Sequence, residues 1–218
     1  TRGPADQGKP SSPELDGYSL QSGSFRVEEF RLPAMTGRIA TAKNAGIAPV
    51  QVPLNVSLSW GNGGPAKGWP VEVSAMLADG YQRLKAYDDF SFSPPQRSRE
   101  NSEASLDGKV VLDKAAIQLD GNGNGKAIVD KLPKLDRRYD LVTEAAYRDP
   151  NGETQTLTRR IALWPSAVQV GISVDSWITA GRALQMKAVA LDTAGKPLAG
   201  KDIKVTLREH RYLSSRKR

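Results

Sequence analysis

The chain has 218 residues, of which 39% are hydrophobic and 25% are charged, a composition typical of globular proteins. It contains no cysteine, which excludes disulfides, cysteine nucleophiles and zinc sites built on cysteine. More than half of the net charge of +7 lies in residues 208–218, so the rest of the chain is nearly balanced and nucleic-acid binding is not expected. No apolar run reaches the roughly 18 residues of a membrane span, and residues 1–15 lack the pattern of a secretory signal.

Residues 1–16 are rich in proline, serine, glycine and aspartate, and they are predicted to form a flexible linker. Beyond them the dominant pattern is an alternation of apolar and polar residues, which indicates half-buried strands. The clearest example is Pro53–Trp60, in which Leu54, Val56, Leu58 and Trp60 share one face. In chain order, the predicted strands are Ser24–Arg31, Pro53–Trp60, Pro70–Leu77, Lys109–Leu119, Lys126–Leu132, Tyr139–Tyr147, Thr154–Trp164, Val168–Val174, Ala183–Leu191 and Lys201–Arg208.

Turns rich in glycine and proline separate these strands. Asp120–Gly125 is predicted to be a hairpin turn between the fourth and fifth strands, and Arg148–Glu153 closes a later hairpin because Asn-Gly accepts positive φ. Many short strands with such turns between them predict an all-β fold of tandem antiparallel β-sandwich modules. Only Ser98–Leu106 is compatible with a turn or two of helix.

Ser91–Gly108 departs from the strand pattern. It is polar and contains Pro94-Pro95, so it is predicted to be a long surface loop. A protease-accessible or partner-binding loop is the alternative interpretation.

The sequence predicts no catalytic, cofactor-binding or metal-binding residue, and no cofactor. The single histidine, His210, lies in the charged tail near Ser214 and Ser215 and is expected to be an ordinary exposed side chain rather than part of a triad. Asp120–Gly125 matches the opening of a calcium-binding loop, but Lys131 stands where that loop needs a bidentate carboxylate. A glycine-rich turn is therefore the better interpretation.

Other polar and aromatic features have equally plain interpretations. Glu28-Glu29 and Asp88-Asp89 are adjacent pairs, and neighbouring residues of a strand point to opposite faces, which does not suit paired acid–base catalysis. Gly61–Pro65 lacks the helix and lysine of a phosphate-binding loop. Large rings at strand ends are predicted to cover the edge of a core, with an exposed carbohydrate-binding platform as the alternative. The tryptophans in such positions are Trp60, Trp69, Trp164 and Trp177.

Four segments of the chain form a recognisable series: Phe25–Pro33, Trp60–Val73, Tyr139–Trp164 and Asp192–Leu207. Together they resemble the macroglobulin domains of bacterial alpha-2-macroglobulins. Phe25–Pro33 (FRVEEFRLP) resembles the strand that leaves one macroglobulin module and enters the next. Trp60–Val73 (WGNGGPAKGWPVEV) resembles the strand-turn-strand of the following module, and Tyr139–Trp164 is similar to its closing hairpin. Asp192–Leu207 (DTAGKPLAGKDIKVTL) resembles a repeat common to these modules.

The resemblance implies a division of the chain into four parts. Residues 1–16 are the linker, and residues 17–32 are the terminal strand or strands of a preceding module with the crossover. Residues 33–164 are expected to form a macroglobulin-like β-sandwich. Residues 165–218 are expected to form a second one, and they have room for only about four strands where an Ig-like sandwich has about seven. We therefore expect the second module to be truncated.

The family further implies a bacterial protease inhibitor that entraps attacking proteases. This chain is expected to be a non-enzymatic scaffold within it, located in the periplasm, with any membrane anchor in a part of the parent that is absent here. Its expected partners are neighbouring macroglobulin modules and, through the full-length parent, proteases; neither nucleic-acid binding nor direct membrane insertion is expected. Without cysteine the chain cannot supply the family's thioester, and no bait segment can be assigned.

Apolar residues at the crossovers are the interface candidates: Phe25, Phe30, Leu32 and Trp164. Each is expected either at a contact between modules or on the core of its own module. Two other classes of function stay open, an Ig-like tandem module of a bacterial adhesin or other cell-envelope interaction protein, and a carbohydrate-binding or lyase-type β-sandwich.

Overall fold

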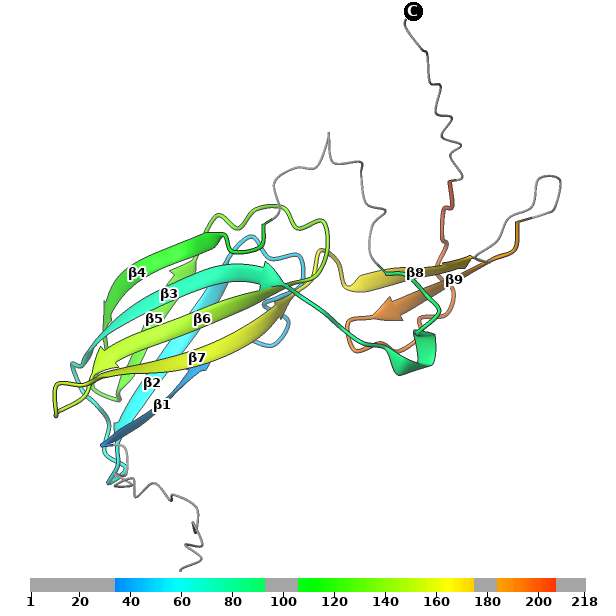
Figure 1. The fold of residues 1–218 in the computed structure, drawn as a ribbon. Helices are drawn as coiled ribbons and strands as arrows, with labels where there is room; N and C mark the ends of the chain where they lie inside the picture. The colour runs from blue at the N-terminus through cyan, green and yellow to red at the C-terminus, as the bar shows by residue number, and fades with distance from the viewer. Residues whose placement is uncertain (1–33, 93–105, 175–183, 207–218) are drawn as a thin grey trace, which may run out of the picture. The chain divides into compact units, whose positions relative to one another are not determined.

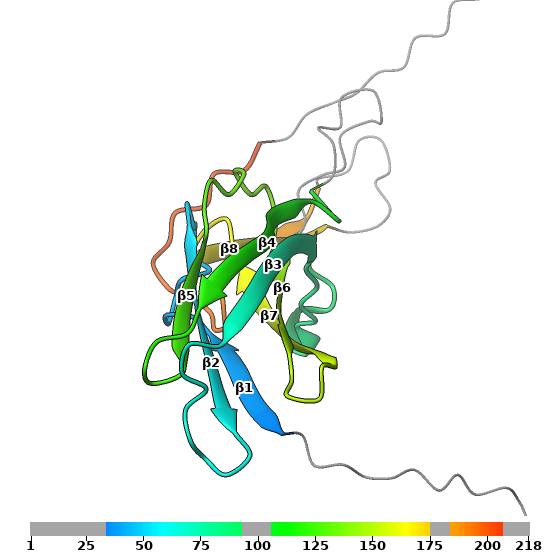
Figure 2. The same ribbon diagram turned by 90° about the vertical axis from the view of Figure 1, so that its left-hand side faces the viewer.

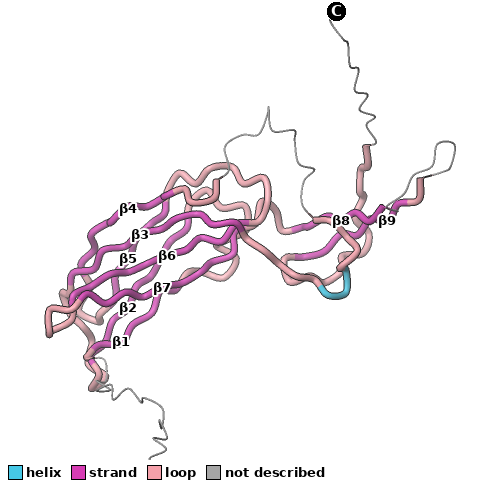
Figure 3. The backbone as a smooth tube through the Cα atoms, viewed as in Figure 1, coloured by secondary structure: helices cyan, strands magenta, loops and turns pink. Residues whose placement is uncertain are grey.

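The computed structural model describes residues 34–92, 106–174 and 184–206. Within these ranges the regular structure is β-strand apart from the 3-10 turn η1 (Lys85–Tyr87) (Figures 1 and 3). The strands are β1 (Met35–Ala40), β2 (Val52–Trp60), β3 (Pro70–Asp79), β4 (Val110–Gln118), β5 (Asn124–Val129), β6 (Tyr139–Arg148), β7 (Thr154–Leu163), β8 (Val168–Val174) and β9 (Met186–Asp192). The predicted all-β class is confirmed. The strand predicted at Ser24–Arg31 and nearly all of Ser98–Leu106 lie outside the described residues.

Strands β1 to β7 form two antiparallel sheets that lie face to face as the layers of a sandwich (Figure 2). One sheet has the order β1-β2-β5 and the other β4-β3-β6-β7. Strands β6 and β7 pair without interruption from Tyr139 opposite Leu163 to Arg148 opposite Thr154. This pairing confirms the hairpin predicted around Arg148–Glu153.

The core lies between these two sheets, because alternate side chains of each strand point inward. On β2, Leu54 and Val56 are fully buried and Leu58 is 2% exposed, as the alternation predicts. On β3, Val71 and Val73 are buried in the same way. Each such side chain stabilises the fold by roughly 1.5–3 kcal/mol, so the alternation of the sequence translates directly into the main source of stability.

One edge of the sandwich carries β-bulges, and the other carries a hydrogen bond between the two sheets. Strand β4 contains bulges opposite Ser74 and Ala75, and at the first of them the backbone N–H of Lys114 donates to Ser74 Oγ at 3.1 Å. Bulges of this kind twist an edge strand and discourage pairing with another chain. On the opposite edge Nη1 of Arg159 in β7 donates to the carbonyl oxygen of Ile39 in β1 at 2.8 Å. That bond ties the two sheets together.

Strands β8 and β9 form a separate two-stranded sheet, with Val168 opposite Asp192 and Val174 opposite Met186. The strand predicted at Lys201–Arg208 is wrong over residues 201–206, which have no regular structure. An alternating sequence alone does not form a strand, because the backbone N–H and C=O groups also need a neighbouring strand as a hydrogen-bond partner. The predicted module boundary at Pro165 stays a prediction.

Two further features differ from the expectations. The Asp120–Gly125 turn is not a hairpin turn within one sheet, because β4 and β5 belong to different sheets. Strand β1 was not predicted, since MTGRIA is short and carries a glycine and an arginine in place of clear alternation. Among the described residues no helix is long and apolar enough to span a bilayer.

Candidate functional site

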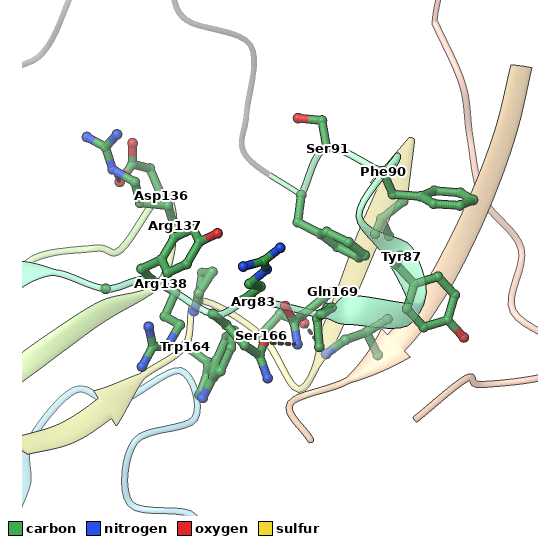
Figure 4. A pocket seen from close by; sticks show the side chains of 18 of the residues that line it. Arg83, Tyr87, Phe90, Ser91, Asp136, Arg137, Arg138, Trp164, Ser166 and Gln169 are labelled. Carbon is green, nitrogen blue, oxygen red and sulfur yellow. Dashed lines mark hydrogen bonds and ion pairs between the residues drawn. The ribbon is translucent and has the colours of Figure 1, made fainter. Parts of the chain in front are cut away.

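A groove of 370 Å³ lies between the sandwich and strand β8. Three stretches line it: the chain that leaves β3, which we call the β3 extension (residues 80–92), the loop before β6 (residues 136–138), and the crossover into β8 (residues 164–170). Figure 4 shows Arg138 and Trp164 on one side of the groove and Tyr87 and Phe90 on the other. The groove is therefore a contact region between parts of the fold rather than a hollow within the core.

The β3 extension reaches the β8–β9 sheet through backbone pairing. The N–H of Ser91 donates to the carbonyl of Ile172 at 2.8 Å, and the N–H of Ile172 donates back to the carbonyl of Ser91 at 3.0 Å. Such a reciprocal pair is the unit from which antiparallel sheets are built. At this point the extension acts as a third strand beside β8.

Glutamine side chains add polar contacts between the same elements. Nε2 of Gln169 in β8 donates to Oε1 of Gln82 at 3.3 Å and to the carbonyl of Asp192 at 2.8 Å. Nε2 of Gln82 in turn donates to the carbonyl of Thr193 at 3.3 Å. Two neutral amides thus bridge the extension, β8 and the turn after β9.

Aromatic rings of the extension pack on the hairpin and on one another. A Cβ atom added to Gly171 would lie 2.6 Å from Cε1 and Cζ of Phe92, so the Phe92 ring sits directly over this glycine of β8. Tyr87 meets Phe90 edge-on at 5.7 Å and Phe92 edge-on at 6.5 Å between ring centroids. These are favourable aromatic geometries, worth about 0.5–1.5 kcal/mol each beyond the area they bury.

Tyr139, at the start of β6, fixes the loop before it. Its side chain is 1% exposed, its hydroxyl donates to Asp136 Oδ1 at 3.1 Å, and it accepts a hydrogen bond from Arg137 Nε at 3.1 Å. Burial raises the pKa of the Tyr139 hydroxyl, and the hydrogen bond to that hydroxyl raises the pKa of Arg137. Both groups keep their usual charge near neutral pH.

Arg138 and Trp164 meet where the sandwich ends and the crossover begins. The guanidinium carbon of Arg138 lies 5.2 Å from the Trp164 ring centroid, a cation–π arrangement, and Nη2 donates to Asp140 Oδ1 at 2.7 Å. Trp164 is 9% exposed, and its backbone bonds to Gly46 and Ala48. Trp164 therefore contacts its own sandwich and also lines the groove beside β8, so both roles expected for it stay predictions.

The charges around the groove are arranged in local pairs. Arg83 pairs with Asp88 at 3.5 Å, and Arg137 pairs with Asp136 at 3.8 Å. Both pairs are exposed, so each contributes only about 0–1 kcal/mol. Among the described residues no cluster of three or more histidine, cysteine, aspartate or glutamate side chains has the geometry of a metal site. The arrangement suits contact between structural elements rather than acid–base chemistry.

The structure gives Asp120 of the candidate calcium loop a structural role. Asp120 Oδ1 accepts the backbone N–H groups of Asn122 and Asn124 at 2.8 and 2.9 Å, which fixes the turn. Lys131, at the position of the missing ligand, lies beyond the end of β5. Asp88 and Asp89 are exposed beside η1, as predicted for a solvated loop.

The same turn occurs three times in the part of the chain that the structure describes. Asp149 Oδ1 accepts N–H groups from residues 151 and 153, and Asp192 Oδ1 accepts N–H groups from residues 194 and 196, all between 2.8 and 2.9 Å. In each copy the glycine three positions after the aspartate has positive φ, which glycine adopts without strain. The Asp-x-x-Gly spacing is therefore the signature of a turn.

Trp60, at the end of β2, and Trp69, just before β3, meet edge-on with ring centroids 5.2 Å apart. Both are partly buried against the core, and Trp69 Nε1 donates to the carbonyl of Arg148 at 2.9 Å. This packing confirms their predicted place at a core edge and leaves no flat pair of exposed rings there. Several candidates lie outside the described residues: Phe25, Glu28, Glu29, Phe30, Leu32, Trp177, His210, Ser214 and Ser215.

The β3 extension was not predicted as a contact element. Its signal was present as a group of aromatic residues, among them Tyr87, Phe90 and Phe92, in a stretch rich in polar side chains. The partner surface on β8, including Gly171, only becomes evident once the two segments are seen together.

No protein-family model matches the sequence. The alpha-2-macroglobulin homolog of Nostoc sp. is 22% identical over 193 residues, which is 88% of this chain and 10% of that protein. The chain thus spans about a tenth of the length of the curated relative that it matches.

Solved structures share the fold. The native conformation of Escherichia coli alpha-2-macroglobulin aligns with a TM-score of 0.58 and 19% identity, covering 79% of this chain and 12% of that one. Salmonella alpha-2-macroglobulin reacted with methylamine aligns with a TM-score of 0.58 and 20% identity over the same shares. Trypsin-activated alpha-2-macroglobulin from E. coli gives 0.57 and 18%, again over 79% and 12%. The match in sequence and the shared fold agree, so the predicted resemblance is confirmed: this chain is similar in sequence to an alpha-2-macroglobulin homolog and shares the antiparallel β-sandwich fold of bacterial alpha-2-macroglobulins.

Proposed function

We propose that this chain is a non-catalytic scaffold within a bacterial protease inhibitor of the alpha-2-macroglobulin type. The observation that carries the proposal is the match to the Nostoc homolog, which runs through 88% of the chain. Structures of relatives activated by trypsin and by porcine elastase identify serine proteases as the class of partner to test.

The described structure suits the role of a structural framework. Its polar side chains are used in turns, in local ion pairs and in contacts between elements, as described for Asp149, Arg83 and Gln82. Rigid sandwiches in series can form a frame, and its rearrangement around a bound protease would be the inhibitory step. In this proposal the chain reaches proteases only through its full-length parent.

The decisive experiment uses the full-length parent protein. The parent is incubated with trypsin, and residual activity is measured on a small peptide substrate and on a large protein substrate such as casein. Entrapment predicts that cleavage of casein falls steeply at equimolar parent while cleavage of the small peptide persists, because only the large substrate is excluded. Equal retention of both activities at every ratio would contradict the proposal.

A control concerns the part played by this chain. The 218-residue chain alone is expected to leave both activities of trypsin unchanged, beyond competition as an ordinary substrate. Inhibition by the isolated chain at equimolar concentration would argue for a direct inhibitor instead of a scaffold.

We further propose a periplasmic location, with any anchor in a part of the parent outside this chain. Cell fractionation of the source bacterium with an antibody to the chain tests this. Recovery with the cytoplasmic fraction would contradict it.

A further inference from the structure

We propose that the β3 extension is a strap that fastens the β8–β9 hairpin to the β1–β7 sandwich, so that the two move as one rigid body. The inference goes beyond the scaffold role. It concerns a contact within this chain and holds whether or not the parent inhibits proteases.

Without the strap the β8–β9 hairpin would be joined to the sandwich only by a short connection. Only residues 165–167 separate the end of the β-bridge at Trp164 from the start of β8 at Val168. A single connection of this kind leaves neighbouring units free to rotate, and relative motion is the default when the interface is small. A second attachment, remote in sequence, is needed to remove that freedom.

The β3 extension supplies this second attachment, and its first end is firmly placed. It continues directly from β3, an inner strand of its sheet that is paired on one side with β4 and on the other with β6. At its start a Cβ added to Gly80 would lie 2.9 Å from the backbone of Tyr139, so the chain leaves the sandwich in close contact with β6.

Beyond Gly80 the extension is held on the hairpin by three independent kinds of contact. The Ser91–Ile172 backbone pair extends the sheet, and the Gln82 and Gln169 amides bridge the extension to β8 and to the turn after β9. The Phe92 ring covers Gly171. These hydrogen bonds and the ring contact all favour the arrangement in which the extension is attached to the hairpin.

The proposed contact also explains why residue 171 is a glycine. A glycine inside a strand weakens it and often marks a place where another group approaches closely. Gly171 is buried within β8, and the approaching group is the Phe92 ring. A second glycine, Gly195, receives Leu84 of the same extension, with an added Cβ 2.6 Å from Leu84 Cδ2. One glycine of β8 and one in the turn after β9 thus lie against two apolar side chains of the strap.

The test measures the distance between the sandwich and the hairpin in the 218-residue chain. Because the chain has no cysteine, Lys126→Cys in β5 and Lys187→Cys in β9 introduce the only two labelling sites, both exposed. Spin labels at these sites report the distance distribution by pulsed electron resonance. We expect one narrow distribution in this background and a clearly broader one when Gly171→Val is added to displace Phe92.

Gly121→Val is the matched control, since an added Cβ there meets no atom within 4 Å. It is expected to leave the distribution narrow. A broad distribution before any strap variant is introduced, or an unchanged narrow one with Gly171→Val, would overturn the proposal.

Phe92→Ala guards against the possibility that Gly171→Val unfolds the hairpin, because it leaves β8 and β9 unaltered. Hydrogen exchange is read at the amides of Ser91 and Ile172 and, separately, across the β8–β9 ladder. We expect exchange at Ser91 and Ile172 to accelerate at least about tenfold while the ladder stays protected. Unchanged protection at both amides in Phe92→Ala would count against the strap.

Discussion

The Asp149 turn gives the sharpest prediction about stability. Asp149 is 9% exposed, and its Oδ1 accepts the backbone N–H groups of Asn151 and Glu153, each at 2.9 Å. Asp149→Ala removes both hydrogen bonds from the turn that closes the β6–β7 hairpin. At about 1 kcal/mol for each bond, the free energy of unfolding should fall by about 2 kcal/mol. For a chain of this size the melting temperature should drop by roughly 4–8 °C.

Two control variants separate the cause. Asp149→Asn keeps an oxygen acceptor at the Oδ1 position and should cost less than about 0.5 kcal/mol. Asp120→Ala removes the same pair of bonds from an exposed copy of the turn, where water can replace the lost acceptor, and should cost about 1 kcal/mol or less.

Thermal and urea denaturation followed by circular dichroism measure all three variants. If Asp149→Asn destabilised the protein as much as Asp149→Ala, the charge rather than the acceptor would be responsible. If Asp149→Ala changed stability by less than about 0.5 kcal/mol, the turn would be held by its glycine alone and the reasoning would be refuted.

Three further predictions follow from the core, the raised pKa of Tyr147 and the partly buried Arg138–Asp140 ion pair. Leu141→Ala, at a fully buried position of β6, should cost about 2–5 kcal/mol in urea denaturation, whereas Val110→Ala, 58% exposed, should cost less than about 0.5 kcal/mol. Burial raises the pKa of Tyr147 above its ordinary value of 10.0, so Tyr147 ionises first in the unfolded chain and the free energy of unfolding should decline above that pH. Tyr147→Phe should make this decline shallower in urea titrations from pH 8 to 11, and an unchanged slope would contradict the prediction. Arg138 has two buried nitrogen atoms, Nε and Nη1, without a hydrogen-bond partner in the described chain. Arg138→Met should therefore lower the free energy of unfolding less than Asp140→Asn, because Asp140→Asn leaves the guanidinium without its counter-charge. The reverse order in urea denaturation would contradict this prediction.

The strands whose alternation is regular could be predicted from the sequence with nearly correct bounds. Pro53–Trp60, Val168–Val174 and the hairpin around Arg148–Glu153 depend on local signals, namely period-two burial and turn residues, which the chain carries in its own order. Strand β1 escaped prediction because its six residues carry too little alternation. Its place is set by its pairing with β2.

The partners of the strands and the contact region needed the tertiary structure. No local sequence signal predicts that Asp120–Gly125 leads from one sheet to the other, because its turn has the same hydrogen bonds as the turn at Asp149, which stays within one sheet. Likewise, a predicted strand at Lys201–Arg208 has the right alternation but, over residues 201–206, no ladder to join.

The sequence by itself determined that this chain is an all-β protein, because the alternation of apolar and polar residues and the Asp-x-x-Gly turns are properties of single segments. Only the tertiary structure decided that the residues after β3 lie against β8, with Phe92 over Gly171 and Gln82 beside Gln169. The physical reason is that these contacts join residues about 80 positions apart, and their energy depends on the complementary shape of two surfaces that no single segment encodes.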